Sequence, residues 1–130
     1  MFLTMLNETE QQAFATLAQR LVAADEVLTS EEVQALDALW REMGFERPVA
    51  DERDESALAA VFGTRRSRVV ALLELLGLAY ADRDFSLDEE SMITTVAHEM
   101  GIDAVDLDRL DRWVEAHVRH LDSALALMTG

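Results

Sequence analysis

The stretch Ala24-Asp25-Glu26-Val27-Leu28-Thr29-Ser30-Glu31-Glu32 returns 57 residues later as Ala81-Asp82-Arg83-Asp84-Phe85-Ser86-Leu87-Asp88-Glu89. The same offset relates Glu42-Met43-Gly44-Phe45 to Glu99-Met100-Gly101-Ile102. Two copies in register indicate a duplicated helix–loop–helix rather than a longer repeat array. The sequence therefore predicts one domain over residues 1–130, with an internal repeat of approximately 8–63 and 65–128.

Apolar residues recur at helical spacing throughout the chain, and no segment alternates with period two for long enough to predict a strand. Asn7 with Glu10 is a start signal for the first helix, and Gly44 is typical of a left-handed helix end. The fold class predicted is all-α, a compact helical bundle of about six helices built from two similar units. The expected helices run over 8–24, 30–43, 57–62, 67–81, 87–100 and 104–128.

The patterns also predict which helix faces are buried. The helix over 67–81 is apolar on nearly all sides and should be central. Its Glu74 either lies in an exposed stripe, forms an ion pair or is a buried functional carboxylate. The helix over 30–43 should bury its apolar face. That face consists of Val33, Leu36, Leu39, Trp40 and Met43. The residues expected to point inward from the last helix are Leu107, Leu110, Val114, His117, Leu121 and Leu125.

The charge balance restricts the partners of this chain. It holds 26 acidic residues against 11 basic ones, a formal net charge of −15. Such a charge repels nucleic-acid phosphates and anionic lipid surfaces and favours cations and basic proteins. The sequence predicts a protein partner that is basic, no nucleic acid and no membrane insertion, and it leaves the oligomeric state open.

Several classes of site are missing from the sequence. There is no cysteine, and neither a Gly-x-Ser-x-Gly elbow nor a glycine-rich phosphate loop is present. No apolar stretch reaches the length of about 20 residues that crosses a bilayer, and the opening residues lack a signal-peptide pattern. These features predict a cytoplasmic protein that is not an enzyme.

The repeated motif carries the candidate site. Thr29 with Glu32, and Ser86 with Glu89, have the spacing of capping boxes, which accounts for these four residues as helix starts. Asp25 and Asp82 instead follow a helix, where a carboxylate faces the negative end of the helix dipole. Either turn chemistry or a bound cation offsets that cost. The second loop also begins like a calcium loop.

A true EF-hand is excluded for that second loop. Its sixth position requires glycine and holds Leu87, and its twelfth requires glutamate and holds Ile93. A looser oxygen-ligand site stays open, because clustered carboxylates select hard cations such as calcium, magnesium and manganese.

With its twin Ala-Asp…Glu motifs, the chain resembles the tellurite-resistance TerB-like family over about residues 17–114. The resemblance implies a compact, acidic, all-helical module connected with stress or tellurite resistance. It also implies a divalent-cation site at Asp25, Glu32, Asp82 and Glu89, for which the preference of carboxylates for hard cations suggests calcium, magnesium or manganese. The family usually has glycine directly after the aspartate, where this chain has Glu26 and Arg83.

Three hypotheses follow for the function. The first is a TerB-like acidic binding module with a divalent cation at the two Asp…Glu loops. The second is a helical protein–protein interaction or scaffolding domain without a metal site. The third, a metal-dependent enzyme, has no complete catalytic set in the sequence.

Overall fold

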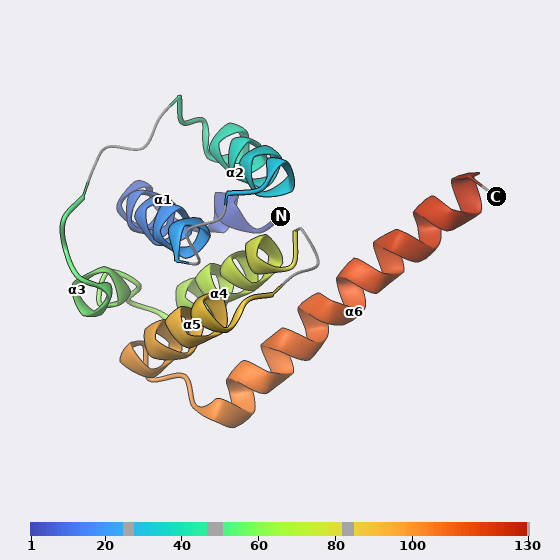
Figure 1. Cartoon of the computed structure of the whole chain (residues 1–130). Coiled ribbons are helices and arrows are strands. Elements are labelled where there is room, and N and C mark those ends of the chain that lie inside the picture. Colours follow the sequence, from blue (N-terminus) through green and yellow to red (C-terminus); the bar gives the residue numbers. More distant parts are fainter. Residues whose placement is uncertain (25–27, 47–50, 82–84, 130) are drawn as a thin grey trace.

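The computed structural model describes residues 1–24, 28–46, 51–81 and 85–129. Within these ranges the chain is helical with no strand, which confirms the predicted all-α fold class. The elements are the 3₁₀ turn η1 (Leu3–Met5) and the helices α1 (Glu8–Ala23), α2 (Ser30–Met43), α3 (Glu55–Ala59), α4 (Arg65–Ala79), α5 (Leu87–Glu99) and α6 (Ala104–Thr129). Figure 1 shows α1 to α5 gathered into one body, with α6 against one side of it.

Side-chain caps set the starts of the helices. Asn7, Thr29 and Ser86 each accept a hydrogen bond from the amide three residues on, and the glutamate there binds back to the cap amide. This reciprocal pattern satisfies two amides that a helix start otherwise leaves without partners. The capping boxes predicted for α2 and α5 and the start signal predicted for α1 are therefore confirmed. The α4 helix begins two residues earlier than expected, because Thr64 caps it.

Two glycines lie at matching places in the two halves of the chain. Gly44 and Gly101 both adopt φ +76°, a left-handed conformation that a Cβ atom disfavours. Each follows the end of the second helix of its half, as the sequence predicts for Gly44. The local structure of the two copies thus agrees at both helix ends. The internal repeat itself, with the bounds 8–63 and 65–128, stays a prediction.

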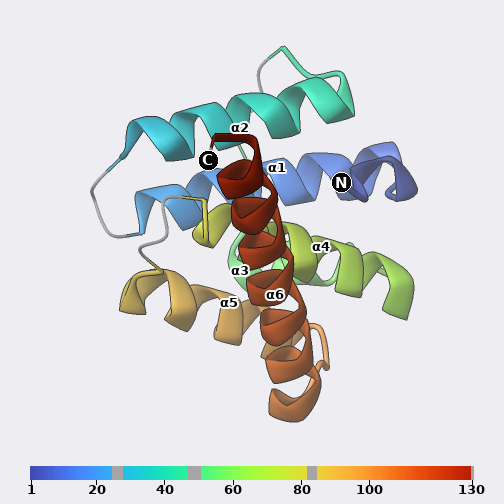
Figure 2. The same cartoon turned by 90° about the vertical axis from the view of Figure 1, so that its right-hand side faces the viewer.

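The core lies around α4, which packs against α1, α5 and α6. Its central position confirms the expectation for this apolar helix. Figure 2 shows α6 running steeply across the other helices. The largest side chains that are fully buried and apolar are Phe14, Phe62, Leu3, Leu17, Leu21, Leu58, Leu72, Leu75, Leu76 and Ile93.

Glu74 on α4 is buried, and its partners are the first two residues of the sequence. Its Oε1 accepts the Phe2 amide at 2.7 Å and lies 3.0 Å from the Met1 amino group. Glu42 of α2 also accepts from this segment, through the Leu3 amide at 2.8 Å. The ion-pair interpretation of Glu74 is therefore confirmed, and the pair fastens η1 onto α4.

Two predictions about buried faces hold only in part. On α2, Met43 is buried and Leu36, Leu39 and Trp40 are half-buried against the core, but Val33 is exposed. On α6 only Val114 is buried, while Leu121 and Leu125 are 51% and 56% exposed. The physical reason on α6 is that the helix extends past the body beyond Leu121, where no other element of the described chain lies beside it (Figure 1).

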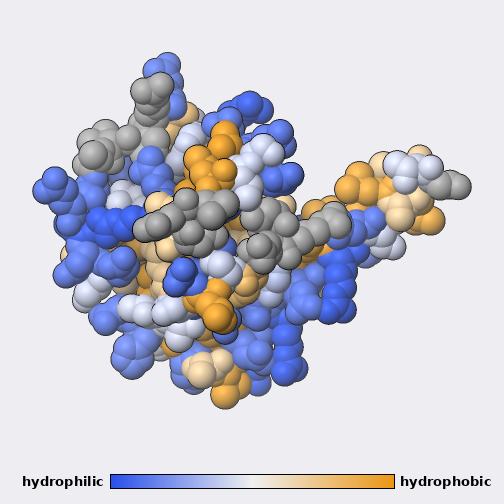
Figure 3. Space-filling model, viewed as in Figure 1, coloured by the Kyte–Doolittle hydropathy of each residue, from blue (hydrophilic) through white to orange (hydrophobic). Residues whose placement is uncertain are grey.

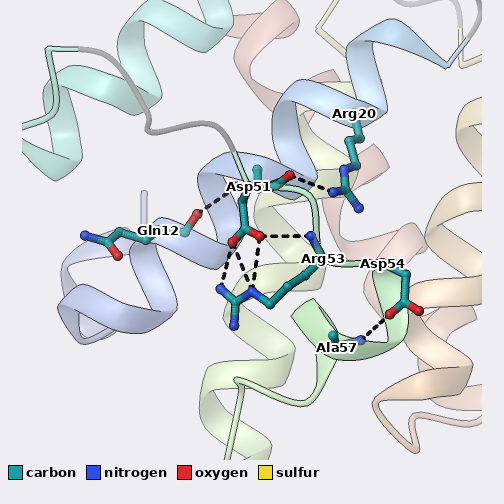
Figure 4. A network of polar contacts seen from close by, with 7 residues as sticks. Gln12, Arg20, Asp51, Arg53, Asp54 and Ala57 are labelled. Atoms are coloured by element: carbon teal, nitrogen blue, oxygen red, sulfur yellow. Dashed lines mark hydrogen bonds and ion pairs between the residues drawn. The ribbon is translucent and has the colours of Figure 1, made fainter.

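Polar contacts fasten the segment before α3. The Arg53 guanidinium donates to the Asp51 carboxylate at 2.7 Å and, with the Arg53 amide, holds the pKa of Asp51 at about 2. Arg20 of α1 donates to the Asp51 carbonyl at 2.9 Å, and Asp54 caps α3 through the Ala57 amide (Figure 4). The bond from Arg20 joins the segment before α3 to α1, and the other two order that segment and the start of α3.

Across the described residues, none of the helices combines the length and the apolar character that crossing a membrane requires.

Candidate functional site

The two capping glutamates of the repeated motif are the most deeply buried carboxylates among the described residues. Glu32 and Glu89 are each only 1% exposed. Glu32 Oε1 accepts the Thr29 hydroxyl at 3.1 Å and the Thr29 amide at 3.3 Å, and Glu89 Oε1 accepts the Ser86 amide at 3.2 Å. The capping role predicted for both residues is confirmed.

Capping does not account for the second carboxylate oxygen of Glu32. This Oε2 atom is buried and has no hydrogen-bond partner in the described part of the chain. A buried carboxylate oxygen without a partner is costly, and such an atom in a native protein calls for an explanation such as a bound ion. The chemistry of Glu32 therefore fits a cation ligand as well as a helix cap.

The other two predicted ligands, Asp25 and Asp82, lie outside the described residues. Within the described ranges, no group of three or more histidine or acidic side chains is arranged to hold a metal ion. The four-residue site at Asp25, Glu32, Asp82 and Glu89 stays a prediction, of which the structure describes the two glutamates.

A groove between α5 and α6 is a second candidate site that the sequence analysis missed. It encloses about 460 Å³, within the range of about 300–1,000 Å³ that is usual for ligand pockets. Its apolar lining comes from three helices, the segment before α5 and the turn before α6, and consists of Leu76, Phe85, Ile93, Ala97, Ile102, Ala104 and Leu107. The polar residues lining it are Glu90, Thr94, His98, Asp103, Asp108 and Asp111.

The carboxylates of the groove are held by bonds of different kinds. Asp103 accepts the Asp106 amide at 2.8 Å and so caps α6. Asp108 accepts from Arg112 at 2.9 Å, which is an exposed pair within one helix. Asp111 accepts the Tyr80 hydroxyl at 2.6 Å. The lining therefore combines apolar side chains with four carboxylates and a single imidazole.

Tyr80 joins α4 to the side of this groove. Burial raises the pKa of the Tyr80 hydroxyl, and the hydrogen bond to Asp111 raises it further. The hydroxyl therefore stays protonated and keeps donating to Asp111. Its ring stacks on Phe85 with centroids 5.0 Å apart. These contacts hold one wall of the groove in place.

Local sequence signals could not have found the groove, because its lining residues come from α4, α5 and α6. The available hint was the spacing of Asp108 and Asp111, which places two acids on one side of α6. No protein-family model, curated protein or solved structure matched this chain in the comparisons made.

Proposed function

We propose that this chain is an acidic helical binding module that takes a basic, amphipathic segment of a partner protein into the groove between α5 and α6. The observation that carries the proposal is the combination of an apolar lining with four carboxylates in one groove. An apolar side chain fully buried there contributes about 1.5–3 kcal/mol. Arginine and lysine suit the acidic positions, because their stems cover apolar surface while their charges reach the carboxylates.

The remaining expectations from the sequence belong to the same proposal. We place the protein in the cytoplasm, assign it no catalytic activity and retain the resemblance to the TerB-like family. A link to stress or tellurite resistance rests on that resemblance alone. The acidic groove supports only the binding role and the basic character of the partner.

The groove is tested with a helical peptide that carries leucines on one face and arginines beside them. We expect Thr94→Trp to weaken binding at least about tenfold, because the indole fills the groove, a loss of about 1.4 kcal/mol. Thr95→Trp is the matched control. Thr95 is the next residue and also donates to the carbonyl four residues back, but it does not line the groove. Fluorescence anisotropy of the labelled peptide measures both.

A second pair of variants tests the electrostatic contribution to peptide binding in the groove. Glu90→Gln with Asp108→Asn should weaken binding about fivefold, because exposed charge pairs contribute about 0.2–1 kcal/mol each. The control, Glu31→Gln with Asp37→Asn, removes the same charges from α2. Equal binding by both tryptophan variants, or by a peptide with glutamates in place of the arginines, contradicts the proposal.

A second candidate function is the binding of a divalent cation at the repeated Asp…Glu loops. The buried Glu32 Oε2 atom without a partner favours it, since capping alone leaves that atom unsatisfied. Calcium, magnesium and manganese are the ions whose preference for oxygen ligands fits carboxylates. The residues that would hold the ion are Glu32 and Glu89, together with the aspartates predicted from the sequence.

Thermal melting with and without these ions tests the cation site. An ion at 100 times its dissociation constant adds about 2.7 kcal/mol and raises the melting temperature by roughly 10 °C. Glu32→Gln with Glu89→Gln should abolish the rise, because glutamine still completes a capping box but is a poor cation ligand. In the presence of a chelator, the melting temperature of this variant should be no lower than that of the parent chain.

The control for the cation site is Glu31→Gln with Asp88→Asn, which removes two charges one position earlier in each copy. It should keep the full rise in melting temperature. If the parent chain shows no ion-dependent rise, or if the control loses as much as the glutamine pair, the cation site is refuted.

A further inference from the structure

One apolar stripe runs the whole length of α6 and is covered over only half of it. We call the α6 stripe the residues Leu107, Leu110, Val114, Val118, Leu121, Leu125 and Met128, which follow one another at spacings of three or four. Such spacing places all of them on one face of a helix. The first four are buried or half-buried, and the last three are more than half exposed.

The change occurs where α6 leaves the body. A cavity of about 210 Å³ lies between α4, α6 and the first two residues, Met1 and Phe2, and Leu121 is the last α6 residue that lines it. Beyond this point the helix continues to Thr129 with no other element beside it (Figure 1). Figure 3 shows apolar surface gathered over this projecting end. The exposed part of the stripe thus continues the same helix face that packs against the body in the first half of α6.

Charge indicates what covers the projecting end. The chain carries −15, but residues 121–130 contain a single ionisable side chain, Asp122. A basic partner gains little electrostatic attraction at this end, because the acidic residues of the chain lie elsewhere. A second copy, in contrast, is repelled by the body and can approach most easily at this nearly neutral end.

We propose that the end of α6 is a homodimer interface, in which the exposed stripe residues Leu121, Leu125 and Met128 pack against the same residues of a second copy. A two-fold arrangement allows one surface to serve both partners. Three side chains on each copy bury less than the roughly 1,000 Å² of a stable interface, so the dimer is weak and reversible. It does not depend on the function proposed for the groove.

The salt dependence separates this surface from the acidic groove. Salt screens the repulsion between two bodies of like charge, so it should strengthen the dimer. The same salt should weaken the binding of a basic peptide in the groove. Opposite responses to one variable therefore distinguish the two surfaces in the same preparation.

Sedimentation from micromolar to millimolar concentration, at low and high salt, tests the proposal. We expect the mass to rise from 14.6 kDa toward twice that value, with the rise at lower concentration in high salt. Leu125→Glu should weaken dimerisation at least about tenfold, since it places two like charges within the paired stripes. Circular dichroism checks that the variant stays helical.

The matched control is Leu127→Glu, which makes the same exchange two residues further along the same helix. Leu127 is 84% exposed and lies off the α6 stripe, so this variant should dimerise nearly as well as the parent chain. Two outcomes overturn the proposal. One is a mass of 14.6 kDa under every condition, and the other is equal loss of dimer in both variants, which would indicate unspecific association.

Discussion

Replacing Leu72 with alanine should lower the free energy of unfolding by about 2–5 kcal/mol, because the site lies at the centre of the bundle. Leu72 is on α4, the helix that contacts α1, α5 and α6, and its side chain has no exposed surface. The loss combines the transfer of the removed methyl and methylene groups with the cavity that remains. Urea unfolding followed by circular dichroism measures it, and the midpoint should fall without a change in slope.

The control for this prediction is the same exchange at Leu87. That side chain is 82% exposed at the start of α5, so Leu87→Ala should change stability by no more than about 0.5 kcal/mol. If the two variants unfold at the same denaturant concentration, α4 is not the centre of the core.

Replacing Val114 with aspartate should release α6 from the body while the rest of the bundle stays folded. Val114 is the one buried residue of α6 in the described chain, and it packs within the core cluster. A carboxylate in its place is buried without a partner, which costs about 3 kcal/mol or more. Protection of the α6 amides from hydrogen exchange should therefore fall roughly 100-fold or more.

The contrast between helices is the decisive part of that measurement. Amides of α1 and α4 should keep most of their protection, since α1 to α5 contact one another without α6. Val105→Asp is the control, because Val105 lies on the same helix and is 64% exposed. An acid near a helix start is also favourable, so this variant should leave α6 in place. A loss of protection spread evenly over all helices would contradict the prediction.

Helix starts were predictable because capping is local chemistry. Asn7, Thr29 and Ser86 each interact with a glutamate three residues away, and such a pattern can be identified without knowledge of the fold. The left-handed Gly44 is local in the same sense, because lack of a Cβ atom removes the steric cost. Thr64 was missed because the sequence expectation began that helix at Ser67, the residue that completes its cap.

Coverage of the helix faces was not predictable. The α6 stripe has the same spacing at Val114 as at Leu125, yet one is buried and the other is exposed. Periodicity indicates which residues share a face, but it carries no information about which element, if any, lies opposite. The same limit applies to α2, where Leu36 and Trp40 are only half-buried.

The candidate sites also contain some features that local sequence predicts and others that only the fold creates. Glu32 and Glu89 were found from spacing alone, whereas the burial of the Glu32 Oε2 atom without a hydrogen-bond partner is a property of the folded structure. The groove brings Glu90 of α5 to the same site as Asp108 and Asp111 of α6. These residues are too far apart in the sequence for a local pattern to show that they share a site.

The order of residues alone established the helices, their caps and the excess of acidic charge, because each depends on interactions within a few neighbours or on simple composition. Packing in three dimensions selected the faces that meet, joined Glu74 to the Met1 amino group, formed the groove and left the end of α6 uncovered. These features depend on contacts between residues far apart along the chain, and a local pattern does not encode such contacts.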